Sequence, residues 1–382
     1  MGNVKTSGQN NITSPNGNSL AVFVDGVTGE MKVKDVMGNI QPLSDFVGGG
    51  GNSPFKYDTN ASGIEPCLGS NNASGVYSTI GGGLSNTASG NCSTVGGGRN
   101  NTASSLVTTV GGGFCNTASN DYSTIGGGFC NTASDLFSIV GGGRNNTASA
   151  YASTIGGGRD NIASNDYSTI GGGNNNNASG YFSTIGGGVN NLASCSSSTV
   201  GGGFCNTASN DYSTVGGGKT NTSSSSFSTV GGGYCNTASG NSSTVGGGYV
   251  NTASSTCSTV GGGKGNISSS AFSTVGGGYT NSATNSWSTL GGGAYNVASG
   301  VWSTVGGGTY NIASGEKSAI LGGENNNTNT CLNAMIVGSD ITADRACTTF
   351  VNNLSIKNIP SSNAGLPSGS IYRIGNAVCI VI

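Results

Sequence analysis

The stretch YSTIGGGFCNTASDL, residues 122–136, decides how this chain folds, because the sequence repeats it with small changes over most of its length. A GGG triplet starts at Gly81 and recurs every fifteen residues to Gly306, sixteen times without an insertion. Fixed spacing without insertions is typical of a solenoid, in which each repeat forms one coil and stacks on the last. Fifteen residues are too few for a pair of helices, but they suit two short strands and two turns.

The composition excludes several classes of protein. Of 382 residues, 73 are Gly and only 7% are charged, with a net charge of −2 and no His. Disordered linkers can have such a composition, but they have no fixed period. The absence of a basic run argues against nucleic acid as a partner, and the absence of His removes the usual general base. No apolar stretch is long enough for a membrane-spanning helix.

Positions in the repeat are numbered from the first Gly of each triplet. Position 15 is Ile, Val or Leu in all sixteen repeats, position 6 is always Asn, and position 8 is Ala except at Ser223 and Ser268. Position 10 is mostly Gly, Asn, Ser or Asp, which favours a turn, and the GGG triplet forms the other corner. The STV and NTAS segments between the corners are predicted to be strands, since β-branched residues favour that conformation.

Stacked parallel coils place equal positions above one another at about 4.8 Å. The Ile/Val column then forms a buried ladder that includes Val200 and Val215, and the Asn column forms an amide ladder that includes Asn206 and Asn221. Positions 12 and 14 are expected on one strand face and positions 13 and 15 on the other; which face fills the coil stays open. One coil buries little apolar surface against an ordering cost of about 1–2 kcal/mol per residue, so we expect a homotrimer.

At YSTIGGGLSNTASG the chain resembles the head repeats of trimeric autotransporter adhesins. The likeness covers roughly residues 67–339 and consists of small residues and Ile before Gly, followed by an Ala-x-Gly segment. It implies a left-handed parallel β-roll with three chains in the bundle. The sequence therefore predicts an all-β protein, a 15-residue-repeat parallel β-solenoid (β-roll), homotrimeric, with small β-hairpin segments at its ends.

The two ends, in SLAVFVDGVTGEMKVKDVMGNIQPL, TADRACTTFVNNLSI and GLPSGSIYRIGNAVCIVI, resemble terminal segments of bacteriophage and large-virus fibre proteins. Asp25-Gly26 and Gly375-Asn376 are turn signals between strands. We expect an N-terminal β-hairpin attachment segment (1–47), a Gly-rich hinge and lead-in (48–66), the β-solenoid repeat array (67–339) and a C-terminal β segment with a hairpin (340–382). The resemblance implies a fibre at the virion surface or outside the cell, anchored to the virion or filament at its N-terminus.

Candidate ligand-binding residues lie near the end of the array, where both Trp of the chain occur. Aromatic side chains suit stacking on carbohydrate, and bulky rings would also serve to cap an exposed solenoid end. The candidates are Tyr279, Trp287, Tyr295, Trp302 and Tyr310. Position 4 is the most variable and carries Arg and aromatic residues, which form either a gripping surface or a solvated edge.

We expect no enzyme, no cofactor and no metal. A glycan-cleaving site needs two carboxylates roughly 5–9.5 Å apart, and none of the 15 acidic residues share a position on adjacent repeats. The GGG corners lack the Lys-Ser/Thr of phosphate loops. Asp121, Asp166 and Asp211 share position 11 only in every third repeat, unlike the Asp of each calcium-binding β-roll repeat.

Cys115 and Cys130 share position 5 on adjacent repeats, at a separation that permits a disulfide. Side chains in parallel register make the required dihedral angle awkward, which favours stacked thiols instead. Because the first residues do not form a secretory signal, we expect mostly reduced thiols. The same residues match the pattern for myristoylation at Gly2.

The favoured function is a structural and adhesive fibre subunit of a virus or phage that attaches to a glycan or protein receptor on a host surface. Two alternatives stay open. One is a self-assembling extracellular filament subunit. The other is an ice-binding solenoid, suggested by the column of Thr at position 14 that runs from Thr79 to Thr304.

Overall fold

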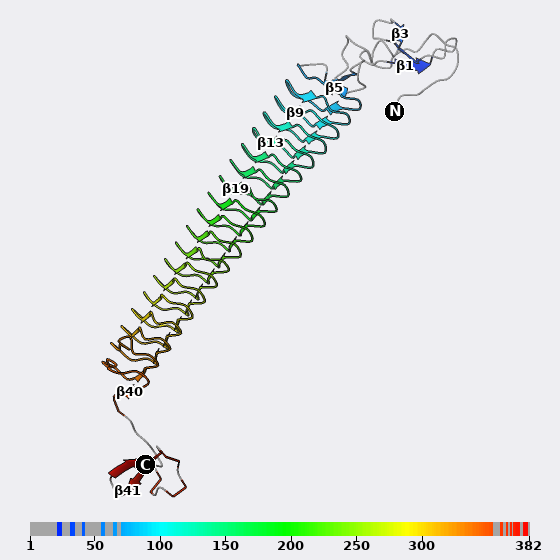
Figure 1. Ribbon diagram of the computed structural model, residues 1–382. Helices are drawn as coiled ribbons and strands as arrows, with labels where there is room; N and C mark the ends of the chain where they lie inside the picture. The colour runs from blue at the N-terminus through cyan, green and yellow to red at the C-terminus, as the bar shows by residue number, and fades with distance from the viewer. Residues whose placement is uncertain are drawn as a thin grey trace. The chain divides into compact units, whose positions relative to one another are not determined.

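The computed structural model describes residues 70–353 and, outside that range, residues 21–24, 31–34, 40–42, 55–57, 64–66, 360–361, 364–365, 367–368, 370–374 and 377–380. The chain divides into two compact units, Met1–Val250 and Asn251–Ile382, each a stack of parallel coils (Figure 1). In the described parts of the chain all the regular secondary structure is β-strand. The predicted all-β solenoid with a repeat of fifteen residues is confirmed.

Each coil of the first unit has two short strands. The strands at positions 14 and 15 are β6 (Thr79–Ile80), β8 (Thr94–Val95), β10 (Thr109–Val110), β12 (Thr124–Ile125), β14 (Ile139–Val140), β16 (Thr154–Ile155), β18 (Thr169–Ile170), β20 (Thr184–Ile185), β22 (Thr199–Val200), β24 (Thr214–Val215), β26 (Thr229–Val230) and β28 (Thr244–Val245). Those at positions 7 and 8 are β7 (Thr87–Ala88), β9 (Thr102–Ala103), β11 (Thr117–Ala118), β13 (Thr132–Ala133), β15 (Thr147–Ala148), β17 (Ile162–Ala163), β19 (Asn177–Ala178), β21 (Leu192–Ala193), β23 (Thr207–Ala208), β25 (Thr222–Ser223) and β27 (Thr237–Ala238).

The second unit has the same coil. Positions 14 and 15 give β30 (Thr259–Val260), β32 (Thr274–Val275), β34 (Thr289–Leu290), β36 (Thr304–Val305) and β38 (Ala319–Ile320), followed by β39 (Met335–Val337) and β40 (Thr349–Val351). Positions 7 and 8 give β29 (Thr252–Ala253), β31 (Ile267–Ser268), β33 (Ser282–Ala283), β35 (Val297–Ala298) and β37 (Ile312–Ala313). Parallel pairing continues from β38 through β39 to β40, past the expected end of the array at residue 339.

Strands pair in parallel and in register with the equivalent strand one repeat away. Val200 lies between Ile185 and Val215, so equal positions form continuous columns as the sequence predicts. The register matters because a shift of one residue would turn every buried side chain outward.

Short strands also occur outside the coils. In the first unit β1 (Ala21–Val24), β2 (Met31–Lys34) and β3 (Ile40–Pro42) form an antiparallel sheet, and β4 (Phe55–Tyr57) pairs with β5 (Ile64–Pro66). In the second unit β41 (Ile371–Ile374) pairs antiparallel with β42 (Ala377–Ile380). Several predictions fall outside the described residues, namely those for Gly2, Asp25-Gly26, residues 48–51 and Gly375-Asn376.

Four columns of side chains fill the coil. In one repeat Asn206, Ala208, Ser213 and Val215, at positions 6, 8, 13 and 15, are 0% exposed. Positions 13 and 15 therefore fill the coil, which answers the question that the sequence left open. Half of this core is polar, so hydrogen bonds supplement the small apolar contribution of Ala and Val.

Position 12 lies in a turn and not on a strand face, which corrects the expectation that it shares a face with position 14. Turn residues occupy positions 10 to 12, and position 12 has a left-handed backbone, with φ of 57° at Tyr122 and 60° at Trp302. Such φ values are uncommon for residues other than Gly. The closure of the coil imposes them here, and they direct the position 12 side chains outward at a corner.

The Asn column joins neighbouring coils through its carboxamides. Asn206 donates from Nδ2 to the carbonyl oxygens of Gly202 (2.8 Å) and Gly218 (2.9 Å). Its Oδ1 accepts from the backbone N–H of Asn221 (3.0 Å) and from the Asn221 side chain (3.2 Å). One buried side chain thus satisfies backbone groups of its own coil and of the next, as buried polar groups require.

Serine hydroxyls close the turn from inside. Ser213 Oγ donates to the carbonyl oxygen of Asn210 at 2.5 Å. The two Ser residues that replace Ala at position 8 are also paired, since Ser223 Oγ donates to Ser228 O at 2.8 Å and Ser268 Oγ to Ser273 O at 2.8 Å. These hydrogen bonds explain why the column tolerates Ser at full burial.

The first and third Gly of each triplet are required by contacts between coils. A Cβ at Gly216 would lie 2.4 Å from Gly231 O, and one at Gly218 (φ +89°) would lie 2.2 Å from Gly233 O. At the middle Gly, Gly217, the nearest atom would be Gly202 O at 3.9 Å, which is an ordinary contact. Contacts between coils of one chain therefore explain the first and third Gly of this triplet, but not the middle one.

The core ladder predicts a large effect for Val200→Asp. The carboxylate would be fully buried between Ile185 and Val215 without a charged partner, and we expect a loss of more than about 4 kcal/mol of unfolding free energy. Thermal and urea unfolding measured by circular dichroism would test this. The control is Thr199→Asp, at the outward-facing neighbour. Equal stability of the two variants would contradict the assignment of the core.

The triplet geometry predicts opposite outcomes for two adjacent substitutions. Gly218→Ala should cost roughly 1–3 kcal/mol for overpacking and about 1–2 kcal/mol more for the left-handed backbone. Gly217→Ala should be neutral or stabilise by about 0.4–1 kcal/mol, because the unfolded chain loses conformational freedom. Urea midpoints of the two variants and the wild type provide the measurement, and a destabilised Gly217→Ala would refute the intrachain explanation.

Candidate ligand-binding surfaces

The exposed aromatic side chains of the coils lie at the two corners, while a few exposed Ile, such as Ile139 and Ile162, lie on the strand faces. The corner at positions 1–5 is called the glycine corner, and the corner at positions 10–12 the turn corner. In the second unit the turn corner carries a row of three rings, Phe272, Trp287 and Trp302. Their centroids are 4.2 Å and 4.8 Å apart, with interplanar angles of 7° and 2°. Trp302 is 51% exposed and is the last ring of the row, because the next repeat has Lys317 at position 12.

The glycine corner of the second unit carries a separate row of Tyr. Tyr279 contacts Tyr295 edge to face at 5.2 Å, and Tyr295 stacks on Tyr310 at 4.9 Å. A hydrogen bond with Tyr279, followed by desolvation, raises the pKa of Tyr295 above its ordinary value. The Tyr295 phenol therefore remains neutral at physiological pH.

The five predicted binding residues thus form two rows and not one cluster. Trp287 and Trp302 lie at the turn corner, whereas Tyr279, Tyr295 and Tyr310 lie at the glycine corner. The capping interpretation is wrong for these rings, because they lie on the flank of the coils and β38, β39 and β40 continue the stack beyond them. Stacking along the row also covers most ring faces, so the row presents ring edges to solvent.

The first unit has an aromatic turn corner of its own. Tyr122 stacks on Phe137, Tyr212 stacks on Phe227, and a further set of edge-to-face and stacked contacts links rings that lie between these pairs. That set includes Tyr151 and Tyr181 at position 11, which the sequence analysis did not single out. The signal that could have found them is their recurrence at one position two repeats apart. The linked rings are Phe137, Tyr151, Tyr167, Tyr181 and Phe182.

Position 4 combines cations and rings along the glycine corner of the first unit. Arg99 lies over Phe114, Phe114 stacks on Phe129, and Arg144 lies over Phe129 on the other side, at 5.3 Å from its centroid. Lys219 Nζ lies between two rings, 5.5 Å from Phe204 and 5.6 Å from Tyr234. Each such contact stabilises an exposed site by about 0.5–1 kcal/mol. Most position 4 side chains, among them Phe129, Phe204 and Tyr249, project to solvent.

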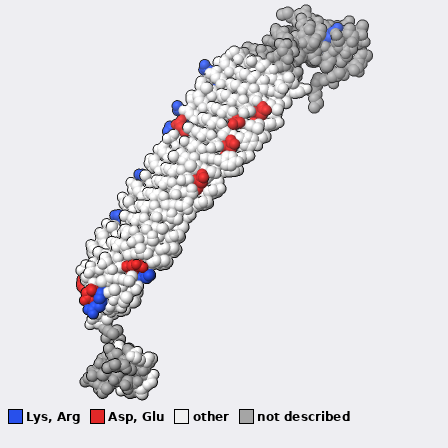
Figure 2. Space-filling view, in the orientation of Figure 1, with Lys and Arg blue, Asp and Glu red and all other residues white. Residues whose placement is uncertain are grey.

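Charges of opposite sign follow different lines on the first unit. Figure 2 shows Lys and Arg along one edge of the coils and most of the acidic residues along a separate line. The cations are Arg99, Arg144, Arg159 and Lys219 at position 4 of the glycine corner. The acids of the turn corner are Asp121, Asp135, Asp166 and Asp211 at positions 10 and 11.

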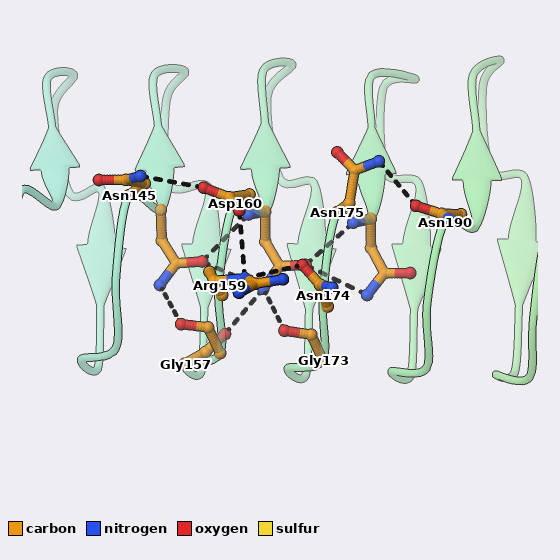
Figure 3. Close-up of polar contacts among 12 residues, drawn as sticks. Asn145, Gly157, Arg159, Asp160, Gly173, Asn174, Asn175 and Asn190 are labelled. Atoms are coloured by element: carbon orange, nitrogen blue, oxygen red, sulfur yellow. Dashed lines mark hydrogen bonds and ion pairs between the residues drawn. The ribbon is translucent and has the colours of Figure 1, made fainter.

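Polar contacts hold the glycine corner in place around Arg159 (Figure 3). Arg159 Nε lies 3.3 Å from Asp160 Oδ2 and donates a hydrogen bond to Asn174 Oδ1 at 3.3 Å. Asn145 Nδ2 donates to Asp160 Oδ1 at 3.1 Å, and Asn175 Nδ2 donates to Asn190 Oδ1 at 2.7 Å. Asn and Asp at position 5 thus bridge coils at a position where their tolerance of left-handed backbone is needed.

The acids at position 11 have a structural role that the sequence did not reveal. Asp166 Oδ1 accepts from the backbone N–H of Tyr151 (3.2 Å), and Asp211 Oδ1 accepts from that of Ser196 (3.1 Å). Asn91 does the same for Val76 at 3.2 Å, so an amide can replace the carboxylate. These hydrogen bonds involve Oδ1 of each carboxylate.

The thiols of the described coils are free, including Cys115 and Cys130. Desolvation and the neighbouring Cys115 raise the pKa of the Cys130 thiol, with a hydrogen bond between them contributing. Among the residues that the structure describes, no three of His, Cys, Asp and Glu are grouped so that they could hold a metal ion. The same residues contain no helix that is long and apolar enough to cross a bilayer.

Comparison with protein-family models and with curated proteins finds no match to this chain. The arguments about its function therefore depend on the geometry of the coils and their corners.

Proposed function

We propose that this chain is a structural and adhesive fibre subunit without enzymatic activity. The observation that supports this most directly is the exposed Trp row on a scaffold of uniform coils. The buried positions carry nearly the same residue types in each repeat, whereas the residues at the exposed corners vary from repeat to repeat. Coils with a constant interior and a variable surface are suited to presenting different binding side chains at defined positions along the stack.

The Trp row offers a ridge of exposed ring edges, and its last ring, Trp302, is followed at position 12 of the next coil by Lys317 and not by another ring. Trp287 is covered by Phe272 and Trp302, while Trp302 has a ring on one side only. A sugar with an apolar face would stack on Trp302, and its hydroxyls would meet the neighbouring polar edge that contains Lys317 and Glu316. We infer that Trp302 is the main contact with a host-surface glycan or protein receptor and that Trp287 supports it.

We further propose that the fibre is a homotrimer on a virion and that its N-terminal segment anchors it there. The support for this is the resemblance of the repeats to trimeric autotransporter heads and of the ends to virus fibre proteins. Three chains in parallel would present three copies of the Trp row, which strengthens attachment by multivalency. The C-terminal part would then be outermost.

An ice-binding solenoid is a second candidate, and one observation favours it. Outward-facing Thr forms a column on each of the two sheets, for example Thr117 and Thr132 at position 7 and Thr199 and Thr214 at position 14. The aromatic rings stand at the corner and not on these strand faces. The position 7 column is interrupted at Ile162, Asn177 and Leu192 and again at Ile267, Ser282, Val297 and Ile312, so only short stretches are regular.

Trp302→Ala should reduce attachment without destabilising the fold. We expect a loss of about 1–3 kcal/mol of binding free energy, by analogy with bases stacked on aromatic side chains, with a melting temperature close to that of the wild type. Binding of the full chain to host cells and to a glycan array gives the measurement. The matched control is Phe227→Ala, at the same position in the first unit and 57% exposed. Equal losses for both variants, or a large drop in melting temperature, would reject the Trp302 site.

A measurement of thermal hysteresis distinguishes the ice-binding solenoid from the adhesive fibre. An ice-binding surface should depress the freezing point of a solution of the full chain below its melting point, and Thr117→Tyr should weaken the effect by breaking the regular hydroxyl column. A freezing point equal to the melting point would reject ice binding.

A further inference from the structure

Three cations and three acids of the first unit lie at similar heights on the two corners of the coil, whereas Arg99 and Asp121 have no opposite charge at theirs. Asp135 and Arg144 are nine residues apart, Arg159 and Asp166 are seven apart, and Asp211 and Lys219 are eight apart. In each pair the acid is at the turn corner and the cation at the glycine corner. Since a coil of fifteen residues rises by about 4.8 Å, the members of a pair differ in height by only about 2–3 Å.

The second unit contains one such pair with the signs exchanged. Lys317 lies at position 12 of the turn corner, and Glu324 lies seven residues later at position 4 of the glycine corner. Glu316 also lies at this turn corner, eight residues before Glu324, and its ion pair with Lys317 at 3.1 Å leaves the two signs mixed at this height.

The two charges of a pair do not meet within one chain. A whole strand separates the corners, and in the described coils the ion pairs join sequence neighbours, as in Arg159–Asp160 at 3.3 Å and Lys317–Glu316 at 3.1 Å. The hydrogen bonds of Asp166 and Asp211 to the backbone involve Oδ1. Asp135 Oδ1 likewise accepts from Asn120 Nδ2 at 3.2 Å and from the backbone N–H of Leu136 at 2.7 Å, so these carboxylates lie against the coil while they remain partly exposed.

Aromatic residues occur at matching heights as well. Phe114 and Tyr122 lie at positions 4 and 12 of one coil, and Phe204 and Tyr212 at the same positions of another. Aromatic residues are enriched at the buried centres of interfaces, where they exclude water from neighbouring charges. The middle Gly leaves space at Gly217, where the nearest atom to an added Cβ would be 3.9 Å away, whereas at Gly112, Gly127 and Gly202 a φ of 156–159° also disfavours a side chain.

We propose that the glycine corner of one copy docks on the turn corner of a second copy, in parallel and without axial stagger. Arg144, Arg159 and Lys219 of one copy would then meet Asp135, Asp166 and Asp211 of the next. Two different surfaces pair, so the contact is head-to-tail, and the homotrimer requires each contact to turn the next copy by a third of a turn, because such contacts form a ring when their rotation closes. This inference rests on the homotrimer of the proposed function and names the surfaces that form it.

A charge exchange between Asp211 and Lys219 tests the docking. The variants are Asp211→Lys, Lys219→Asp and the double variant, each in the full chain, with the dissociation constant of the assembly measured by analytical ultracentrifugation at about 0.1 M salt. Each single variant should place like charges together and raise the dissociation constant roughly tenfold or more. The double variant should recover most of the wild-type affinity, because the exchanged charges meet again between copies.

The control exchanges charges that lie at different heights. Asp121→Lys combined with Lys219→Asp should show no recovery, because these residues are more than six coils apart. Additive effects of Asp211→Lys and Lys219→Asp in a wild type that is trimeric would overturn the pairing of corners but leave the trimer. A wild type that stays monomeric would overturn both, while attachment through Trp302 would still be decided by its own assay.

Discussion

The carboxamide of Asn at position 6 is the interaction on which every coil depends. A corner made of three Gly has backbone carbonyls but no side chains, and in a coil this small they would be buried without partners. Asn206 supplies two donors to such carbonyls and one acceptor to the next coil. Asp would lack the donors, and Leu would leave all of these groups unpaired, at about 1–3 kcal/mol for each.

Much of the fold could be predicted because the buried positions repeat the same residue types. The period, both strands, the Ile/Val ladder and the Asn ladder follow from columns that the sequence holds nearly constant. Position 12 could not be placed in this way. Tyr122 and Trp302 belong to residue types that favour strands, but the closure of the coil holds them in a left-handed turn.

The candidate site was predictable as a set of residues but not as an arrangement. Sequence alone locates the five aromatic residues near the end of the repeats. Their separation into two rows depends on which corner positions 4, 5 and 12 occupy, and the covering of ring faces depends on stacking in register. The charge relation between corners is likewise visible only once the corners are known, although its seven- to nine-residue spacing is present in the sequence.

The sameness of the interior also bears on how the chain reaches its native state. A strand such as β22 can pair with any other strand at positions 14 and 15 and form the same buried contacts, so the core does not distinguish the correct neighbour from one that is a whole repeat away. The slip is opposed by the lost contacts of the one coil that is left out and by its loop entropy, which grows slowly with loop length. Misregistered coils are therefore natural kinetic traps for this chain. Sequential growth, in which each coil adds to the one just completed, avoids them by offering one template at a time.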